Sequence, residues 1–208
     1  MRFAALFLFI LCLAGPAAAQ QQNTDVVAKV TRLEKAAVAM QDALPRPLKV
    51  GSEVQLGDVI STGKGARVEL TFSDGTTARL GERTQFTVIE FVVEQNGGNA
   101  VMRLMKGAMQ MTSGTLMKVA DSSMIVQTET ATIGIRGTTF WVGTIEDDME
   151  VALFSGKGVY VENAGGRVEL TRSGQGTSIG DMDQIPSEPV FWGKDKLDQA
   201  AATTAFSK

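Results

Sequence analysis

The stretch Thr128–Val142 reads TETATIGIRGTTFWV and is rich in β-branched residues. Val126, Thr128 and Thr130 alternate with polar neighbours, which is the spacing of a strand with one buried face. The run Thr138–Val142 follows without a break, which is typical of a strand that is buried on both faces. The stretch therefore predicts strands that cross the core of a β domain.

Two glycines interrupt this stretch. Gly134 and Gly137 bracket Ile135 and Arg136, so the backbone bends there or another group approaches it closely. Isolated glycines in strand patterns usually serve geometry, and we interpret both as structural. Two hypotheses stay open for Arg136, whose side chain either is solvated or paired, or binds an anionic partner.

Outward from this stretch, apolar residues repeat at every second position. Arg67–Phe72 alternates, and Thr76–Leu80 returns with its apolar side chains towards the same core. Asp74 and Gly75, which lie between these two segments, predict a tight two-residue turn of type I′, which needs positive φ at both positions. Further strands are predicted at 57–60, 85–93, 101–105, 108–111, 150–154, 158–161 and 167–171. The pattern predicts an all-β fold, in a sandwich or a coiled, solenoid-like arrangement.

The two ends of the predicted domain differ in pattern. Apolar residues in Val26–Leu44 follow a 4-3-4-3-4 spacing, which favours an amphipathic helix over two short strands at 28–33 and 36–40. Pro186 and Pro189 mark the end of the β region. The alanine-rich segment Asp195–Ala205 predicts a short terminal helix.

Residues 1–19 have the pattern of a secretory signal peptide. Arg2 precedes an apolar run, and small residues lead to a cleavage site before Gln20. Cys12, the single cysteine of the chain, lies inside that run. We therefore expect a periplasmic or secreted protein without disulfides, divided into a signal peptide (1–19), a flexible lead (20–25), a β domain (26–185) and a C-terminal tail (186–208).

Composition excludes several classes of function. Without Arg2, 19 basic residues stand against 23 acidic ones, a net charge of −4, which disfavours nucleic-acid binding. The chain has no histidine, so histidine-based catalysis and histidine-bound zinc are excluded. Ser61 and Lys64 match a serine-x-x-lysine motif only in spacing. We expect no enzyme, no cofactor, no metal site, and no membrane segment after signal cleavage.

Several fragments together resemble the FecR family of periplasmic domains. They are LGDVISTG at 56–63, Val68–Phe72, Asp74-Gly75-Thr76, Val126-Gln127-Thr128 and Ile135–Phe140, in an order that matches over about 26–179. The resemblance implies an all-β periplasmic domain that opens with a strand pair near 26–40, with Lys35 at a position where a glycine is expected. It implies no catalytic residues. The family-motif positions, for which we expect structural roles, are Gly57, Asp58, Gly63, Asp74, Gly75, Thr128, Arg136, Gly137, Thr138 and Phe140.

The family resemblance also suggests a function. In the founding regulators, this domain follows a cytoplasmic segment that binds a sigma factor and a membrane helix, and it receives a signal from an outer-membrane siderophore transporter. We expect the present chain to lack both preceding segments. The favoured hypothesis is a non-catalytic protein-interaction module that senses, regulates or scaffolds in the cell envelope. The alternative is an envelope protein that binds glycan or another polymer through exposed aromatic residues such as Trp192.

Overall fold

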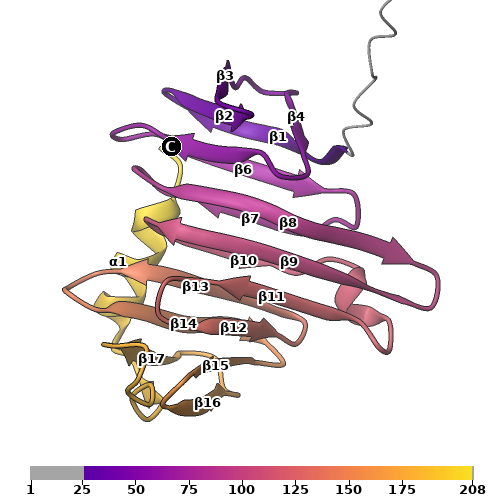
Figure 1. The fold of residues 1–208 in the computed structure, drawn as a ribbon. Helices are drawn as coiled ribbons and strands as arrows, with labels where there is room; N and C mark the ends of the chain where they lie inside the picture. Colours follow the sequence, from indigo (N-terminus) through magenta and orange to yellow (C-terminus); the bar gives the residue numbers. More distant parts are fainter. Residues whose placement is uncertain (1–25, 208) are drawn as a thin grey trace, which may run out of the picture.

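The structure is a computed structural model that describes residues 26–207, and the predicted signal peptide and flexible lead lie outside this range. Strands of the described chain form two nine-stranded sheets, so the predicted all-β fold is confirmed (Figure 1). Sheet A has the order β18 (Val190–Phe191), β17 (Gln175–Ile179), β14 (Met149–Gly156), β13 (Thr138–Thr144), β10 (Met109–Thr112), β7 (Thr77–Leu80), β6 (Arg67–Phe72), β1 (Val26–Glu34), β4 (Glu53–Gln55). Sheet B has the order β16 (Gly166–Leu170), β15 (Val159–Asn163), β12 (Thr132–Ile135), β11 (Ser123–Gln127), β9 (Gly97–Lys106), β8 (Gln85–Glu94), β5 (Val59–Thr62), β2 (Ala37–Gln41), β3 (Leu44–Pro47).

The chain builds these sheets by alternating between them. The hairpin β6–β7 lies in sheet A, β8–β9 in sheet B, β13–β14 in sheet A and β15–β16 in sheet B. Paired strands are antiparallel throughout the described chain, except that β9 and β11 are parallel. Each hairpin adds to the end of its sheet, so the chain advances from one end of the sandwich to the other (Figure 1).

The core lies between the two sheets. Leu70 and Phe140 of sheet A and Phe86, Met102 and Val126 of sheet B are fully buried in one cluster. Burying a side chain of this kind stabilises the fold by about 1.5–3 kcal/mol. This core holds both sheets in a fixed position, and the outer faces and corners are left for other roles.

The N-terminal segment forms strands β1 and β2, so the helix that its spacing favoured is wrong. The pairing of β1 with β6 shifts between Val30 and Arg32, and its pairing with β4 shifts between Val26 and Ala28. Such bulges break the alternation of period two. Val26, Met40 and Leu44, half of the residues that gave the helical spacing, are 40% exposed or more, so that spacing did not mark a buried face. Lys35, at the corner between β1 and β2, has φ 57°, the left-handed conformation that a glycine adopts easily.

The turn between β6 and β7 also differs from the prediction. The amide of Phe72 donates to the carbonyl of Thr76 (2.9 Å), so three residues, not two, form the loop. Gly75 has φ +83°, whereas Asp74 is not among the residues with positive φ, so the turn is not type I′. The Asp74 carboxylate instead accepts the amide of Thr76 at 2.8 Å, an interaction that favours a different local geometry. The apolar side chains of both strands face the core, as predicted.

The central stretch is divided by a turn that its alternation did not reveal. Strand β11 ends at Gln127, so the strand spacing predicted through Thr130 is wrong. The Thr128 hydroxyl donates to the carbonyl of Ala131 (2.9 Å) and accepts its amide (3.0 Å), and this local bonding replaces the sheet ladder. Strand β13 is buried on both faces as predicted, because Phe140 faces the core and Trp141 lies under the C-terminal helix.

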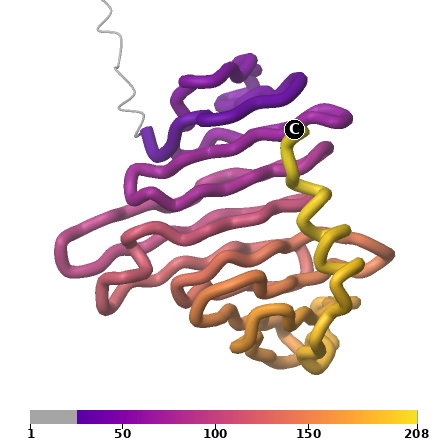
Figure 2. Tube along the Cα trace, turned by 180° about the vertical axis from the view of Figure 1, so that it is seen from behind, coloured from indigo at the N-terminus to yellow at the C-terminus, as the bar shows by residue number. Residues whose placement is uncertain are grey.

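The terminal helix α1 (Lys194–Thr204) is confirmed, and it crosses the outer face of sheet A towards the N-terminal strands (Figure 2). Trp141 donates from Nε1 to the Thr203 hydroxyl at 2.8 Å and packs edge-on against Trp192, their ring centroids 6.2 Å apart. Strand β18 follows Pro189, so the prolines do not end the β region. Between residues 26 and 207 no helix has the length and apolar character needed to cross a membrane.

Candidate functional site

The first group of family-motif residues builds a corner beside β5. Asp58 is 1% exposed, and its Oδ2 accepts the amide of Gln55 (2.8 Å) and Nη2 of Arg46 (2.5 Å). Gly57 has φ +83°, and the amide of Gly63 donates to the carbonyl of Ala36 at 3.0 Å. These residues fix the path of the chain at this corner.

The second group is centred on Asp74. Its Oδ2 accepts the Thr76 hydroxyl (2.9 Å) and the amide of Leu116 (3.1 Å), while its carbonyl accepts the amide of Thr115 (2.9 Å). Asp74 therefore ties the β6–β7 turn to the start of the 3₁₀ helix η1 (Leu116–Lys118), which is distant in sequence. Gly75 has open space where a Cβ atom would lie, so its positive φ is the reason that a glycine occupies this position.

Buried threonines form hydrogen bonds that connect neighbouring segments at the corners of the sandwich. Thr138 donates to the carbonyl of Gly158 (3.0 Å) and accepts its amide (2.9 Å). Thr62 donates to the carbonyl of Gly81 (2.6 Å) and accepts the amide of Thr84 (2.8 Å). Thr138 is among the family-motif positions named above. Thr62 lies in the family fragment 56–63 but was given no role, because a single threonine in a strand gives no sign of the corner that it will face.

Gly134 and Gly137 are each required to be glycine for a different physical reason. At Gly134 a Cβ atom would enter the ring of Tyr160, the cross-strand neighbour on β15, so close approach explains this residue. At Gly137 the nearest atom to an added Cβ would be Cδ of Lys157 at 3.8 Å, but φ is +76°. Gly137 therefore serves the turn before β13 through its conformation and not through lack of space.

Arg136 is paired in a network on the outer face of sheet B. Its two terminal nitrogens donate to both carboxylate oxygens of Glu169 at 3.1 and 3.0 Å, and Arg167 donates to Glu169 at 2.8 Å. These hydrogen bonds, from Arg136 first and Arg167 second, lower the pKa of Glu169 below its ordinary value. The Arg167 guanidinium lies 3.7 Å from the centroid of the Tyr160 ring. Arg136 is therefore an ion-paired side chain, which is one of the two hypotheses left open for it.

An apolar row crosses the outer face of sheet B beside this network. Val101 of β9 is opposite Ile125 of β11, Ile125 is opposite Gly134, and Gly134 is opposite Tyr160. Ile89 lies at the bulge of β8 next to Val101 and is 41% exposed. These four side chains, Ile89, Val101, Ile125 and Tyr160, are called the sheet B row below.

A pocket opens on the other side of the molecule, where β10, β13 and β14 reach their ends. It has a volume of about 270 Å³ and is lined by Thr112, Ser113, Gly114, Met117, Lys118, Gly137, Thr138, Thr139, Ser155, Gly156 and Lys157. Two lysines line this pocket and no carboxylate does. Gly137 and Thr138 are the family-motif residues that it includes, and sequence reasoning did not find the lysines.

Candidate residues for metal binding, catalysis and sugar stacking can be located in the structure. Within residues 26–207, no three His, Cys, Asp or Glu side chains gather as a metal site would require. No hydrogen bond joins Ser61 to Lys64 in the described chain, and Lys64 is exposed. Trp192 is 9% exposed and packs against Trp141, so it does not offer a free face for stacking on a sugar.

Comparison with known proteins identifies the domain. No curated protein matches the chain. Two solved structures described as a putative anti-sigma factor from Parabacteroides distasonis ATCC 8503 have TM-scores of 0.55 and 0.53, at 19% and 20% identity. Each comparison covers 67% of this chain and 62% of the other, so this chain spans less than two thirds of those proteins. At this identity the likeness concerns the fold. The family model of the FecR protein matches residues 58–157, which include Asp58, Asp74, Thr128 and the Gly137 corner, and the chain therefore carries a domain of the FecR family.

Proposed function

We propose that this protein is a non-catalytic, periplasmic protein-interaction module with a sensing, regulatory or scaffolding role in the cell envelope. The FecR domain at 58–157 supports the regulatory assignment, and the described anti-sigma factors of similar fold agree with it. The signal-peptide pattern of residues 1–19 supports export. The family-motif residues form turns and corners. Such structural roles are typical of a domain that binds its partners through other residues on its surface.

The observation that carries the proposal is the sheet B row. Helix α1 covers part of the outer face of sheet A, and the chain from 26 to 207 provides no comparable cover for the sheet B row. Aromatic and aliphatic side chains next to arginines are the composition of interface centres. Tyr160 is held by Gly134 beneath it and by Arg167 above it, so its ring is ordered before any partner arrives. Such preorganisation reduces the entropy cost of binding.

The test is capture of partners from an envelope extract, with the purified protein as bait and mass spectrometry as the readout. Ile125→Lys places a charge in the centre of the row and should abolish recovery of the specific partner. Val190→Lys, which replaces an exposed apolar residue of sheet A by the same charge, is the matched control and should leave recovery unchanged. Equal recovery by wild type and Ile125→Lys would refute the assignment of this surface. Cell fractionation tests the periplasmic location, and a cytoplasmic protein of full-length mass would contradict it.

A further inference from the structure

A transverse line of hydroxyl groups crosses the outer face of sheet A. Thr71 of β6 is opposite Thr77 of β7, which is opposite Thr112 of β10. The line continues through Thr139 of β13 to Ser155 of β14, and at its other end the Thr31 hydroxyl bonds that of Thr71. The hydroxyl ladder comprises Thr31, Thr71, Thr77, Thr112, Thr139 and Ser155.

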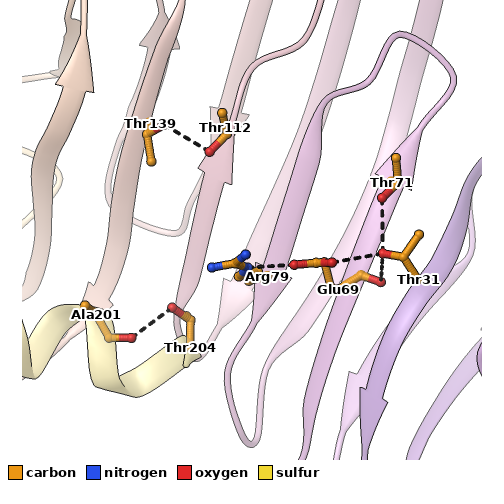
Figure 3. Close-up of polar contacts among 8 residues, drawn as sticks. All are labelled: Thr31, Glu69, Thr71, Arg79, Thr112, Thr139, Ala201 and Thr204. Carbon is orange, nitrogen blue, oxygen red and sulfur yellow. Dashed lines mark hydrogen bonds and ion pairs between the residues drawn. The ribbon is translucent and has the colours of Figure 1, made fainter. Parts of the chain in front are cut away.

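Strand geometry makes the ladder regular. Adjacent strands lie about 4.8 Å apart, so the residues that carry the hydroxyls repeat at that interval. Thr31 and Thr71 are 3.1 Å apart and Thr112 and Thr139 are 3.0 Å apart, oxygen to oxygen (Figure 3). Each hydroxyl has one donor and two acceptor positions, so these bonds leave unused capacity towards a ligand. The neighbouring Glu69 carboxylate is engaged by Thr31 and by Nε of Arg79 at 2.7 Å.

Both ends of the ladder lie in depressions of the surface. Thr112, Thr139 and Ser155 line the pocket with Lys118 and Lys157 described above. Thr31 and Thr71 line a second pocket of about 350 Å³ together with Val26, Lys29 and Phe72. The ladder therefore connects two pockets, which suits a ligand that is longer than either.

The charge of the first pocket is positive. Lys118 and Lys157 are exposed, and neither has an ion pair with any residue between 26 and 207. The turn at Gly137 brings Lys157 next to η1, so residues far apart in sequence present two ammonium groups to one cavity. Hydroxyl and ammonium groups together, without a carboxylate in the lining, are complementary to an anion that also carries hydroxyls.

We propose that the hydroxyl ladder and its lysine pocket form a binding site for an acidic polysaccharide, with the chain lying across the strands of sheet A. The hydroxyls would bond the polar groups of successive sugars, and Lys118 and Lys157 would pair with an acidic group. An extended peptide fits less well, because these strands lie inside the sheet and offer it no unpaired backbone edge. The site lies on a different sheet from the sheet B row and does not depend on a protein partner.

The experiment measures binding of the purified protein to three polymers by affinity electrophoresis: polygalacturonate, neutral dextran and poly-glutamate. We expect retardation by polygalacturonate alone, weakened by salt because the lysine contacts are exposed. Lys118→Ala with Lys157→Ala should lower the affinity about tenfold, since both exposed charge pairs with the polymer are lost. Lys49→Ala with Lys106→Ala removes the same amount of charge outside the proposed site, and it should change the affinity for polygalacturonate little.

A second pair of variants tests the hydroxyls and keeps the strand shape. Thr112→Val with Thr139→Val should lower the affinity several-fold without lowering the melting temperature, whereas Thr87→Val on sheet B should have no effect. Equal retardation by poly-glutamate would overturn the proposal in favour of an acidic peptide or a general anion site. Absence of binding to polygalacturonate, or an equal loss in the Lys49 and Lys106 control, would also overturn it.

Discussion

Gly137 offers the sharpest test of how the central stretch works. Its φ of +76° lies in the left-handed region, and an added Cβ would meet only ordinary contacts at 3.8 Å or more. Gly137→Ala should therefore cost about 1–2 kcal/mol of unfolding free energy, the penalty of a Cβ in this conformation. Gly137→Val should cost about 2–3 kcal/mol because a β-branched side chain is a stronger outlier there. Gly137→Asn should cost less than either, since asparagine enters this region more readily.

The assay is thermal and urea unfolding of the purified protein followed by circular dichroism. At this chain length, 1 kcal/mol corresponds to a shift of about 2–4 °C in the melting temperature. Gly134→Ala is the comparison, because there the Tyr160 ring occupies the Cβ position. The stability lost in Gly134→Ala should be largely restored when Tyr160→Ala is added. Tyr160→Ala should not restore the stability lost in Gly137→Ala. If Gly137→Asn is as unstable as Gly137→Val, the cause is space and not φ, and the reasoning is refuted.

Two further predictions concern a strained corner and an ion pair. Lys35→Gly should raise the free energy of unfolding by about 0.5–1 kcal/mol, because the residue has φ 57° and glycine adopts that conformation without strain; a lower urea midpoint would contradict this. The Glu169 carboxyl should titrate below its ordinary pKa of 4.5 when followed by NMR, and Arg136→Gln should raise that pKa. Because the folded pKa is depressed, the stabilising contribution of this group is present above about pH 4.5 and is lost as the pH falls through the folded value. An unchanged titration in Arg136→Gln would show that the pair does not form.

Several features followed from local sequence. Alternation in Arg67–Phe72 and Thr77–Leu80 placed their apolar side chains in the core, because a strand sends successive side chains to opposite faces. The FecR pattern, matched at 58–157, was recognisable from fragments such as Asp74-Gly75-Thr76. The errors also have local causes. The helical spacing counted the exposed residues Val26, Met40 and Leu44 as one apolar face while β1 contains bulges, and the side chains of Asp74 and Thr128 formed turns that alternation does not encode.

The candidate surfaces could not be predicted because they depend on register between distant strands. Thr71, Thr112 and Thr139 look like ordinary strand residues until pairing aligns them across sheet A. Lys118 and Lys157 line the same pocket only because the corner at Gly137 lies beside the η1 turn. Asp74 holds that turn in place through a hydrogen bond to the amide of Leu116. The sequence by itself determined the regular strands such as β6 and β7, their inward faces and the family, since these rest on period two and short motifs. The tertiary structure decided which outward-facing side chains become neighbours, because sheet register and the path of α1 are set by contacts far apart along the chain.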